Sequence, residues 1–171
     1  MKLFAKIVLG TVLAVTAIVA VVLIGARFAD GPLEIIAGGP FTSGEPQLAV
    51  PSDWSFVKDM ETIEFQSLEP PRSRTVWVLV HEGRLFIPSG YMDSAWGRIW
   101  KQWPIEAERD GRIITRIDGK LHNHNLVRLR EGSMLKPLLE QLSRKYMGGQ
   151  PIPEAAVAFG ALWLFELTPR A

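Results

Sequence analysis

The sequence predicts a mainly β domain that also holds α-helices, with an antiparallel sheet of six to seven strands curled into a barrel behind one N-terminal membrane helix. Three observations predict this architecture. A run of twenty residues near the N-terminus carries no charge. Short β-branched and aromatic runs recur between tight-turn dipeptides such as Asp118-Gly119. The length of 171 residues suits one ordinary domain plus an appendage.

The apolar run, residues 7–26, predicts a transmembrane anchor. At the rise of an α-helix these residues cover about 30 Å, the thickness of the hydrocarbon core of a bilayer. A cleaved signal peptide is the alternative, but its apolar region is usually about 7–15 residues long. The residues around Ala26-Arg27-Phe28-Ala29 also make a poor cleavage site. An uncleaved anchor is therefore the favoured interpretation.

Charges beside the run predict its orientation. Lys2 and Lys6 precede it, and Arg27 alone follows it closely. The excess of positive charge on the cytoplasmic side then places residues 1–6 in the cytoplasm. We expect a single-pass membrane protein whose folded domain is periplasmic or extracellular.

Residues 27–52 are rich in glycine and proline, which predicts a tether without regular structure. The barrel domain is then expected over residues 53–171. The chain contains no cysteine, which excludes disulfides, thiol nucleophiles and cysteine-ligated metal centres. No Ser/His/Asp arrangement or phosphate-binding glycine loop stands out, so hydrolase chemistry has no support.

The first strands are predicted from apolar periodicity. Residues 61–68 alternate imperfectly and end at Pro70-Pro71. Residues 74–80 form a continuous β-branched and aromatic run, typical of a central strand buried on both faces. Glu82-Gly83 predicts a hairpin into a third strand at 84–89.

The second half is predicted to hold two helices and four strands. A short helix is expected from Asp93 or Ser94 to a point before Pro104, and a longer one from Ser133 to Met147, with a leucine stripe that packs in the core. The expected strands are 105–109, 112–117, 120–130 and 161–168, the first three joined by turns at Asp110-Gly111 and Asp118-Gly119.

The connection between the third and fourth strands concentrates tryptophans and cations: Trp96, Arg98, Trp100, Lys101 and Trp103. The stretch 94–145 holds 11 basic and 6 acidic residues, whereas 30–93 holds 4 basic and 10 acidic ones. A basic half in a domain of negative net charge favours a local anionic ligand over nucleic acid. The alternative is that the indoles plug the barrel and the cations face water.

Two histidines, His122 and His124, point to one face of a strand because they are two residues apart. They could begin a haem or metal site. No carboxylate stands at a clear ligand spacing, so a solvated sheet face is the favoured interpretation and no metal site is predicted.

The strand order and the stretch 75–129 resemble the flavin-binding split β-barrels, the pyridoxamine 5′-phosphate oxidase-like superfamily that includes deazaflavin-dependent nitroreductases. The residues that carry the resemblance are the strand 75–80, the hairpin into Leu85-Phe86-Ile87-Pro88-Ser89-Gly90, the connection with Ser94, Trp96, Arg98 and Trp103-Pro104, the Asp118-Gly119 turn, and the closing Leu167-Thr168-Pro169-Arg170. The Gly-Arg-x-Ser-Gly turn of the deazaflavin branch is absent, because this chain has His81-Glu82-Gly83-Arg84 there.

The resemblance implies a split β-barrel that binds FMN or a deazaflavin, often across a homodimer interface. Carried over by position, it implies cofactor contacts from Ser89, Gly90 and Tyr91 to the ring or ribityl chain, an aromatic wall at Trp96, and phosphate contacts from Ser94, Arg98 and Lys101. The implied function is an oxidoreductase for a small or lipid-soluble acceptor. The alternative is a non-catalytic accessory domain that docks on a membrane partner.

Overall fold

The structure is a computed structural model that describes residues 2–94 and 101–170. Its elements, in chain order, are α1 (Lys2–Ala26), β1 (Glu45–Pro46), η1 (Ser55–Val57), β2 (Thr62–Ser67), β3 (Arg72–Trp77), β4 (Leu79–His81), β5 (Arg84–Gly90), α3 (Trp103–Arg109), β6 (Arg112–Ile117), β7 (Lys120–Leu129), α4 (Leu135–Tyr146), α5 (Ala155–Ala158) and β8 (Leu162–Pro169).

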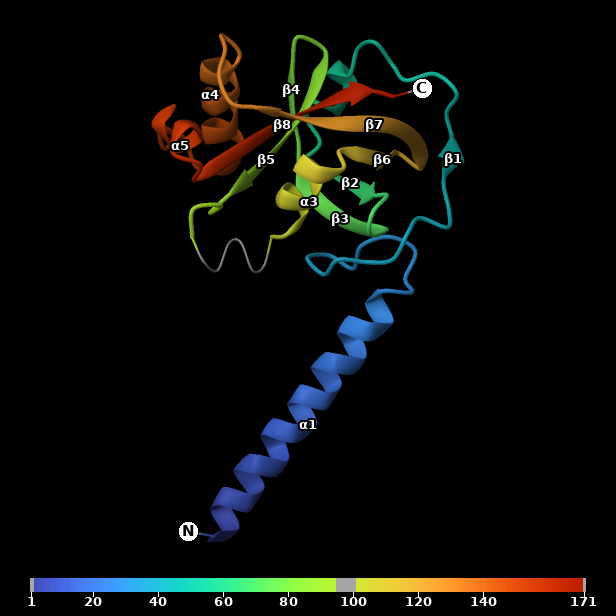
Figure 1. Ribbon diagram of the computed structural model, residues 1–171, viewed down its shortest axis with the longest axis vertical. Helices are drawn as coiled ribbons and strands as arrows, with labels where there is room; N and C mark the ends of the chain where they lie inside the picture. The colour runs from blue at the N-terminus through green and yellow to red at the C-terminus, as the bar shows by residue number, and fades with distance from the viewer. Residues whose placement is uncertain (1, 95–100, 171) are drawn as a thin grey trace.

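One antiparallel sheet organises the domain, with the strand order β3-β2-β6-β7-β8-β5-β4. The short strand β1 joins the start of β7 in parallel, with Glu45 opposite Lys120. In Figure 1 the strands curl around one another, and α4 and α5 lie together on one side of the sheet. The predicted class, a curled antiparallel sheet with helices, is confirmed.

The two outer strands of this order, β3 and β4, are consecutive in the chain and are joined by Val78, which is fully buried. The segment 72–81 therefore pairs with β2 through its first half and with β5 through its second. This closes the curled sheet without leaving two free edges. The predicted single central strand at 74–80 was wrong, because the chain bends at Val78 to serve both edges.

At the bend, the backbone of Val78 is not paired with a neighbouring strand. Side chains at the end of α4 form its hydrogen bonds instead. The Tyr146 hydroxyl accepts a hydrogen bond from the Val78 N–H at 3.1 Å and lies 2.8 Å from the Val78 carbonyl oxygen. The Lys145 ammonium donates to the same carbonyl at 3.0 Å. Burial raises the pKa of Tyr146 to about 12, so this hydroxyl keeps its proton. The end of α4 thus fixes the point where the sheet closes.

Tyr146→Phe is expected to lower the free energy of unfolding by about 1–3 kcal/mol, because it leaves the buried Val78 N–H without a partner. Chemical unfolding of the detergent-solubilised protein measures the change. The chain contains one other tyrosine, Tyr91, whose side chain is exposed. Tyr91→Phe is the matched control and should change stability by less than about 0.5 kcal/mol. Equal effects of the two variants would contradict this role of Tyr146.

Apolar side chains pack on both faces of the sheet. Alternate residues of β5 point to opposite faces, so that Leu85 and Ile87 join the cluster inside the curl while Phe86 joins the cluster under the helices. The leucines of α4 bury as predicted and complete the outer cluster: Leu135, Leu138, Leu139 and Leu142. The strand buried on both faces is therefore β5, not the segment 74–80.

Three further local predictions were wrong. Residues 105–109 are not a strand but part of α3, which begins at Trp103 and carries Pro104 in its first turn, a position where a missing N–H costs nothing. Consequently Asp110-Gly111 joins a helix to a strand and is not a hairpin. Helix α4 begins after Met134 with no side-chain cap, so Ser133 does not cap it. The hairpins at Glu82-Gly83 and Asp118-Gly119 are confirmed, with all four residues at positive φ.

Helix α1 is long and apolar enough to span a membrane over Leu3–Ala26, and none of its most apolar window is buried within the protein. In Figure 1 it extends away from the sheet. The segment that follows contains no helix, yet it lies against the domain: Gly38 pairs with Ser73 of β3, and β1 pairs with β7. The predicted domain boundaries stay predictions.

Candidate functional site

The predicted cofactor residues that the structure describes gather where β5 ends. Gly90 closes the pairing of β5 with β8, and Tyr91 then turns the chain with a φ of 63°. The Ser94 hydroxyl donates to the Tyr91 carbonyl oxygen at 2.9 Å, which tightens this turn. The Tyr91 ring is exposed. The turn therefore presents hydroxyl groups and an aromatic face at the surface.

Lys101 lies beside this turn. Its ammonium donates to the Gly90 carbonyl oxygen at 3.3 Å and lies 5.6 Å from the centre of the Tyr91 ring. Burial lowers the pKa of Lys101, because part of its hydration is lost. Among residues 2–94 and 101–170, no carboxylate lies within ion-pair distance of it. An anion bound here would restore the interactions that burial removes.

Ion pairs or backbone carbonyls hold the other partly buried cations of the basic stretch. Arg116 pairs with Asp30 and Glu64, at 3.0 Å and 2.6 Å. Arg128 pairs with Glu108 at 2.7 Å. Lys145 donates to backbone carbonyls of the residues before β2 and of Val78. Arg116 and Arg128 are therefore neutralised within the domain. Lys101 and Lys145 have no carboxylate partner among the described residues, but Lys145 donates to three backbone carbonyls there and Lys101 to one.

The remaining predicted site residues separate into two groups. Ser89 is buried, and its hydroxyl contacts the Met92 sulfur at 3.4 Å, so it faces the interior. Trp96 and Arg98 lie outside the described residues. The structure thus brings together Gly90, Tyr91, Ser94 and Lys101, which come from two parts of the chain.

Trp103 belongs to the core. It is 6% exposed and packs edge-on against Phe65, with ring centres 5.2 Å apart, and against Phe165 at 5.4 Å. For this indole, the alternative that tryptophans fill the barrel is correct.

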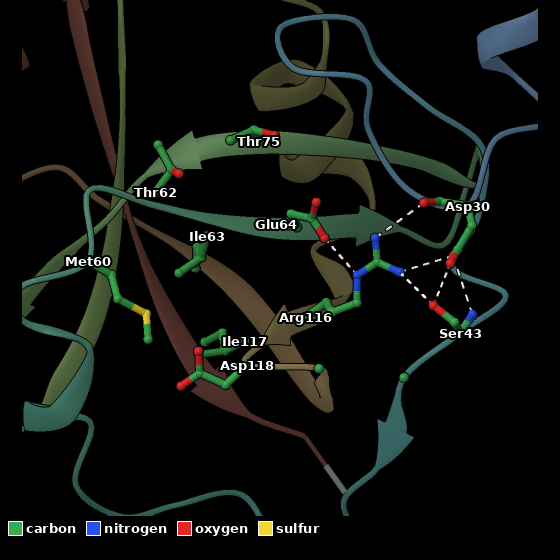
Figure 2. A pocket seen from close by; sticks show the side chains of 12 residues that line it. Asp30, Ser43, Met60, Thr62, Ile63, Glu64, Thr75, Arg116, Ile117 and Asp118 are labelled. Carbon is green, nitrogen blue, oxygen red and sulfur yellow. Dashed lines mark hydrogen bonds and ion pairs between the residues drawn. The ribbon is translucent and has the colours of Figure 1, made fainter.

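A cavity of about 660 Å³ lies elsewhere, beside Arg116. Figure 2 shows the guanidinium of Arg116 held between Asp30 and Glu64, with Asp118 on the same wall. Hydrogen bonds from Ser43 and from the Thr42 N–H hold the pKa of Asp30 well below its usual range. Three carboxylates thus oppose one guanidinium among the lining residues, which disfavours an anionic ligand. The cavity was not predicted from the sequence, because its charges come from three distant segments.

The two histidines are buried, so the predicted solvated face was wrong. His124 is fully buried and its Nδ1 lies 3.2 Å from the Thr115 hydroxyl, while His122 packs edge-on against Trp54. His124 Nε2 and His122 Nδ1 have no hydrogen-bond partner in the part of the chain that the structure describes. Burial lowers the pKa of both, that of His124 to about 4. Within the described residues, no three histidine or acidic side chains gather as metal ligands would.

Comparison with known proteins adds two solved structures. No family model matches the chain, and no curated protein matches it. A Listeria innocua protein provisionally named pyridoxamine 5′-phosphate oxidase is 15% identical, with a TM-score of 0.48, over 68% of this chain and 90% of its own. A conserved hypothetical protein from Mycobacterium tuberculosis is 13% identical, with a TM-score of 0.48, over 74% of this chain and 86% of its own. At identities this low, neither likeness carries a function over to this chain.

Proposed function

We propose that the chain is a membrane-anchored split-barrel protein that binds a phosphorylated flavin or deazaflavin at the end of β5 and reduces a small or lipid-soluble acceptor. The observation that carries the proposal is Lys101, a partly buried ammonium without a carboxylate partner among the described residues, beside an exposed aromatic ring. Such a pair suits a ligand with an anionic group and a planar ring. The unburied apolar surface of α1 supports the anchor.

Each of these residues would have its own chemical role. Lys101 supplies a charged donor for phosphate, and the Ser94 hydroxyl holds the adjacent turn through its hydrogen bond to the Tyr91 carbonyl oxygen. Tyr91 offers its ring face to a planar group. The bound cofactor would itself supply the electron transfer, so the domain needs no acid–base pair of its own. Its tasks would be to hold the ring and to limit its contact with water.

An FMN titration of the full chain in detergent, followed by flavin fluorescence, tests the proposal. Lys101→Ala is expected to weaken binding about 10–100-fold, the usual worth of a charge-assisted hydrogen bond. Lys136→Ala is the matched control, because it removes the same charge from the exposed surface of α4. Its affinity should equal that of the wild type. Equal losses in both variants, or no binding by the wild type, would exclude this site.

A non-catalytic docking domain on a membrane partner is the second candidate. Two observations favour it. Trp103 fills the barrel interior, and the described residues at the end of β5 do not line the cavity beside Arg116. The visible absorption spectrum of the protein extracted from its native membrane distinguishes the two. A flavin or deazaflavin band supports the oxidoreductase, and a colourless protein that takes up neither cofactor supports the docking domain.

A further inference from the structure

Apolar side chains stand exposed directly after α1. Phe28 is 85% exposed and Ile35 is 88% exposed. Leu33 is half-exposed and pairs through its backbone with Ile36, which makes a tight turn with Ile35 at its tip. We call Phe28, Leu33 and Ile35 the apolar rim. Exposed apolar groups gathered in one short segment are typical of an interaction surface.

The segment that bears the rim is held tightly against itself. A side chain on Gly39 would approach the Arg27 carbonyl oxygen to 2.5 Å, and one on Gly38 would approach the Gly31 carbonyl oxygen to 1.7 Å. Residues 38 and 39 therefore pack directly on the turn that follows α1. These glycines permit close packing, whereas the sequence predicted a tether without regular structure here.

The same segment is also fixed to the sheet at two points. The backbone of Gly38 pairs with Ser73 of β3, and the Ser73 hydroxyl donates to the Gly39 carbonyl oxygen at 2.6 Å. Arg116 of β6 pairs with the Asp30 carboxylate and also donates to the Asp30 carbonyl oxygen at 3.2 Å. The end of α1, the rim and the sheet are thus linked by short contacts. Figure 1 shows the segment at the end of the domain from which α1 extends.

We propose that the apolar rim lies in the lipid interface of the membrane that α1 spans, so that the barrel rests on the bilayer in one orientation. The rim is continuous with the span, because Phe28 follows Ala26 by only two residues. Aromatic and aliphatic side chains at this depth contact the boundary between headgroups and acyl chains. Arg27 and Glu34 are exposed beside the rim, where the headgroup layer leaves them hydrated. This inference requires the anchor but not the cofactor.

Single-cysteine labelling tests the proposal cleanly, because the chain has no cysteine of its own. The full chain is reconstituted into phosphatidylcholine–phosphatidylglycerol vesicles with an environment-sensitive fluorophore at Ile35→Cys. Ile18→Cys, within the span, is the positive control, and Leu48→Cys, fully exposed and beyond β1, is the negative one. Lipids that carry a nitroxide near the headgroup quench labels at the interface, and lipids that carry one deep in the acyl chain quench the label at residue 18.

The label at residue 35 is expected to emit at shorter wavelength than the label at residue 48, and to be quenched several-fold more strongly. Emission and quenching equal to those of residue 48 would overturn the proposal. An apolar environment without lipid quenching would also overturn it, because a second protein surface would then cover the rim. A label at residue 18 that lipids do not quench would show that α1 does not span the bilayer. The emission wavelength and the lipid quenching depend neither on flavin binding nor on Lys101, so this inference is tested separately from the proposed cofactor site.

Discussion

Trp103→Ala is expected to lower the free energy of unfolding by about 3–5 kcal/mol, the largest loss among the variants considered for this domain. Trp103 begins α3 and fills the inside of the curled sheet, against Phe65 of β2 and Phe165 of β8. Removing the indole leaves a cavity between strands that are distant in sequence. Because Trp103 and Ala107 bury one face of α3 in this core, the packing of the helix is expected to loosen as well.

Chemical unfolding in detergent, followed by circular dichroism, measures the loss. Trp77→Ala is the matched control: it removes the same side chain, but Trp77 is 45% exposed and stacks on Tyr146 at the surface. This control should cost about 1–2 kcal/mol. If Trp103→Ala proved no more destabilising than Trp77→Ala, the indole at 103 would not be a core residue, and its role as part of a ligand wall would be open again.

Acid is expected to destabilise the domain through His124, by about 3 kcal/mol between pH 6.5 and pH 4. The folded pKa of His124 is lowered from 6.5 to about 4, chiefly by burial, with smaller contributions from the nearby charges of His122 and Arg170. Above pH 6.5 the imidazole is mostly neutral in the folded and the unfolded state, so it does not change the free energy of unfolding. As the pH falls through this window, the unfolded chain binds a proton that the folded domain excludes, so stability is lost. Below about pH 4 both states are protonated and this loss ends.

His124→Gln isolates the contribution of this residue, because glutamine retains a polar group for the Thr115 hydroxyl but does not titrate. Unfolding free energies of both proteins are compared at pH 7.5 and pH 4.5. The wild type should lose about 3 kcal/mol more than the variant. Carboxylates with lowered pKa values, such as Asp110 at about 2, are present in both proteins and cancel in the comparison. Parallel losses would show that His124 is not the group responsible.

The local elements that the sequence predicted well are those fixed by neighbouring residues. The Glu82-Gly83 and Asp118-Gly119 turns adopt positive φ, a conformation that glycine favours and that determines a two-residue hairpin. The leucine stripe of α4 buries as its spacing requires. In each case the spacing of the apolar residues, or the residue types in the turn, is enough to predict the element.

The errors arise where tertiary contacts decide the outcome. Nothing local marks Val78 as a bend, because its backbone partners come from α4, more than sixty residues away. The helix predicted to end before Pro104 falls mainly outside the described residues. Pro104 itself lies in the first turn of α3, a position that proline favours, so a helix replaces the predicted strand 105–109. His122 and His124 alternate with polar residues and so resembled a solvated face, although Trp54 from a separate segment covers them.

The candidate site was predicted in part. The hairpin and the connection after β5 pointed to the cluster of Gly90, Tyr91, Ser94 and Lys101, which the fold brings together. The pairing of the neighbouring arginines could not be predicted, because their carboxylates lie on other strands and in the segment after α1. That pairing separates Lys101 from the partly buried arginines of the basic stretch, Arg116 and Arg128.

Comparison of FMN with riboflavin is the sharpest test of a phosphate site at Lys101, because the two ligands differ by the phosphate alone. Calorimetric titration of both ligands into the wild type and Lys101→Ala forms a double-mutant cycle on this contact. If Lys101 contacts the phosphate, the wild type should bind FMN about 10–100-fold more tightly than riboflavin, and Lys101→Ala should remove the difference while riboflavin affinity is unchanged. A preference for FMN that survives in Lys101→Ala, or a wild type that binds neither ligand, would contradict such a site.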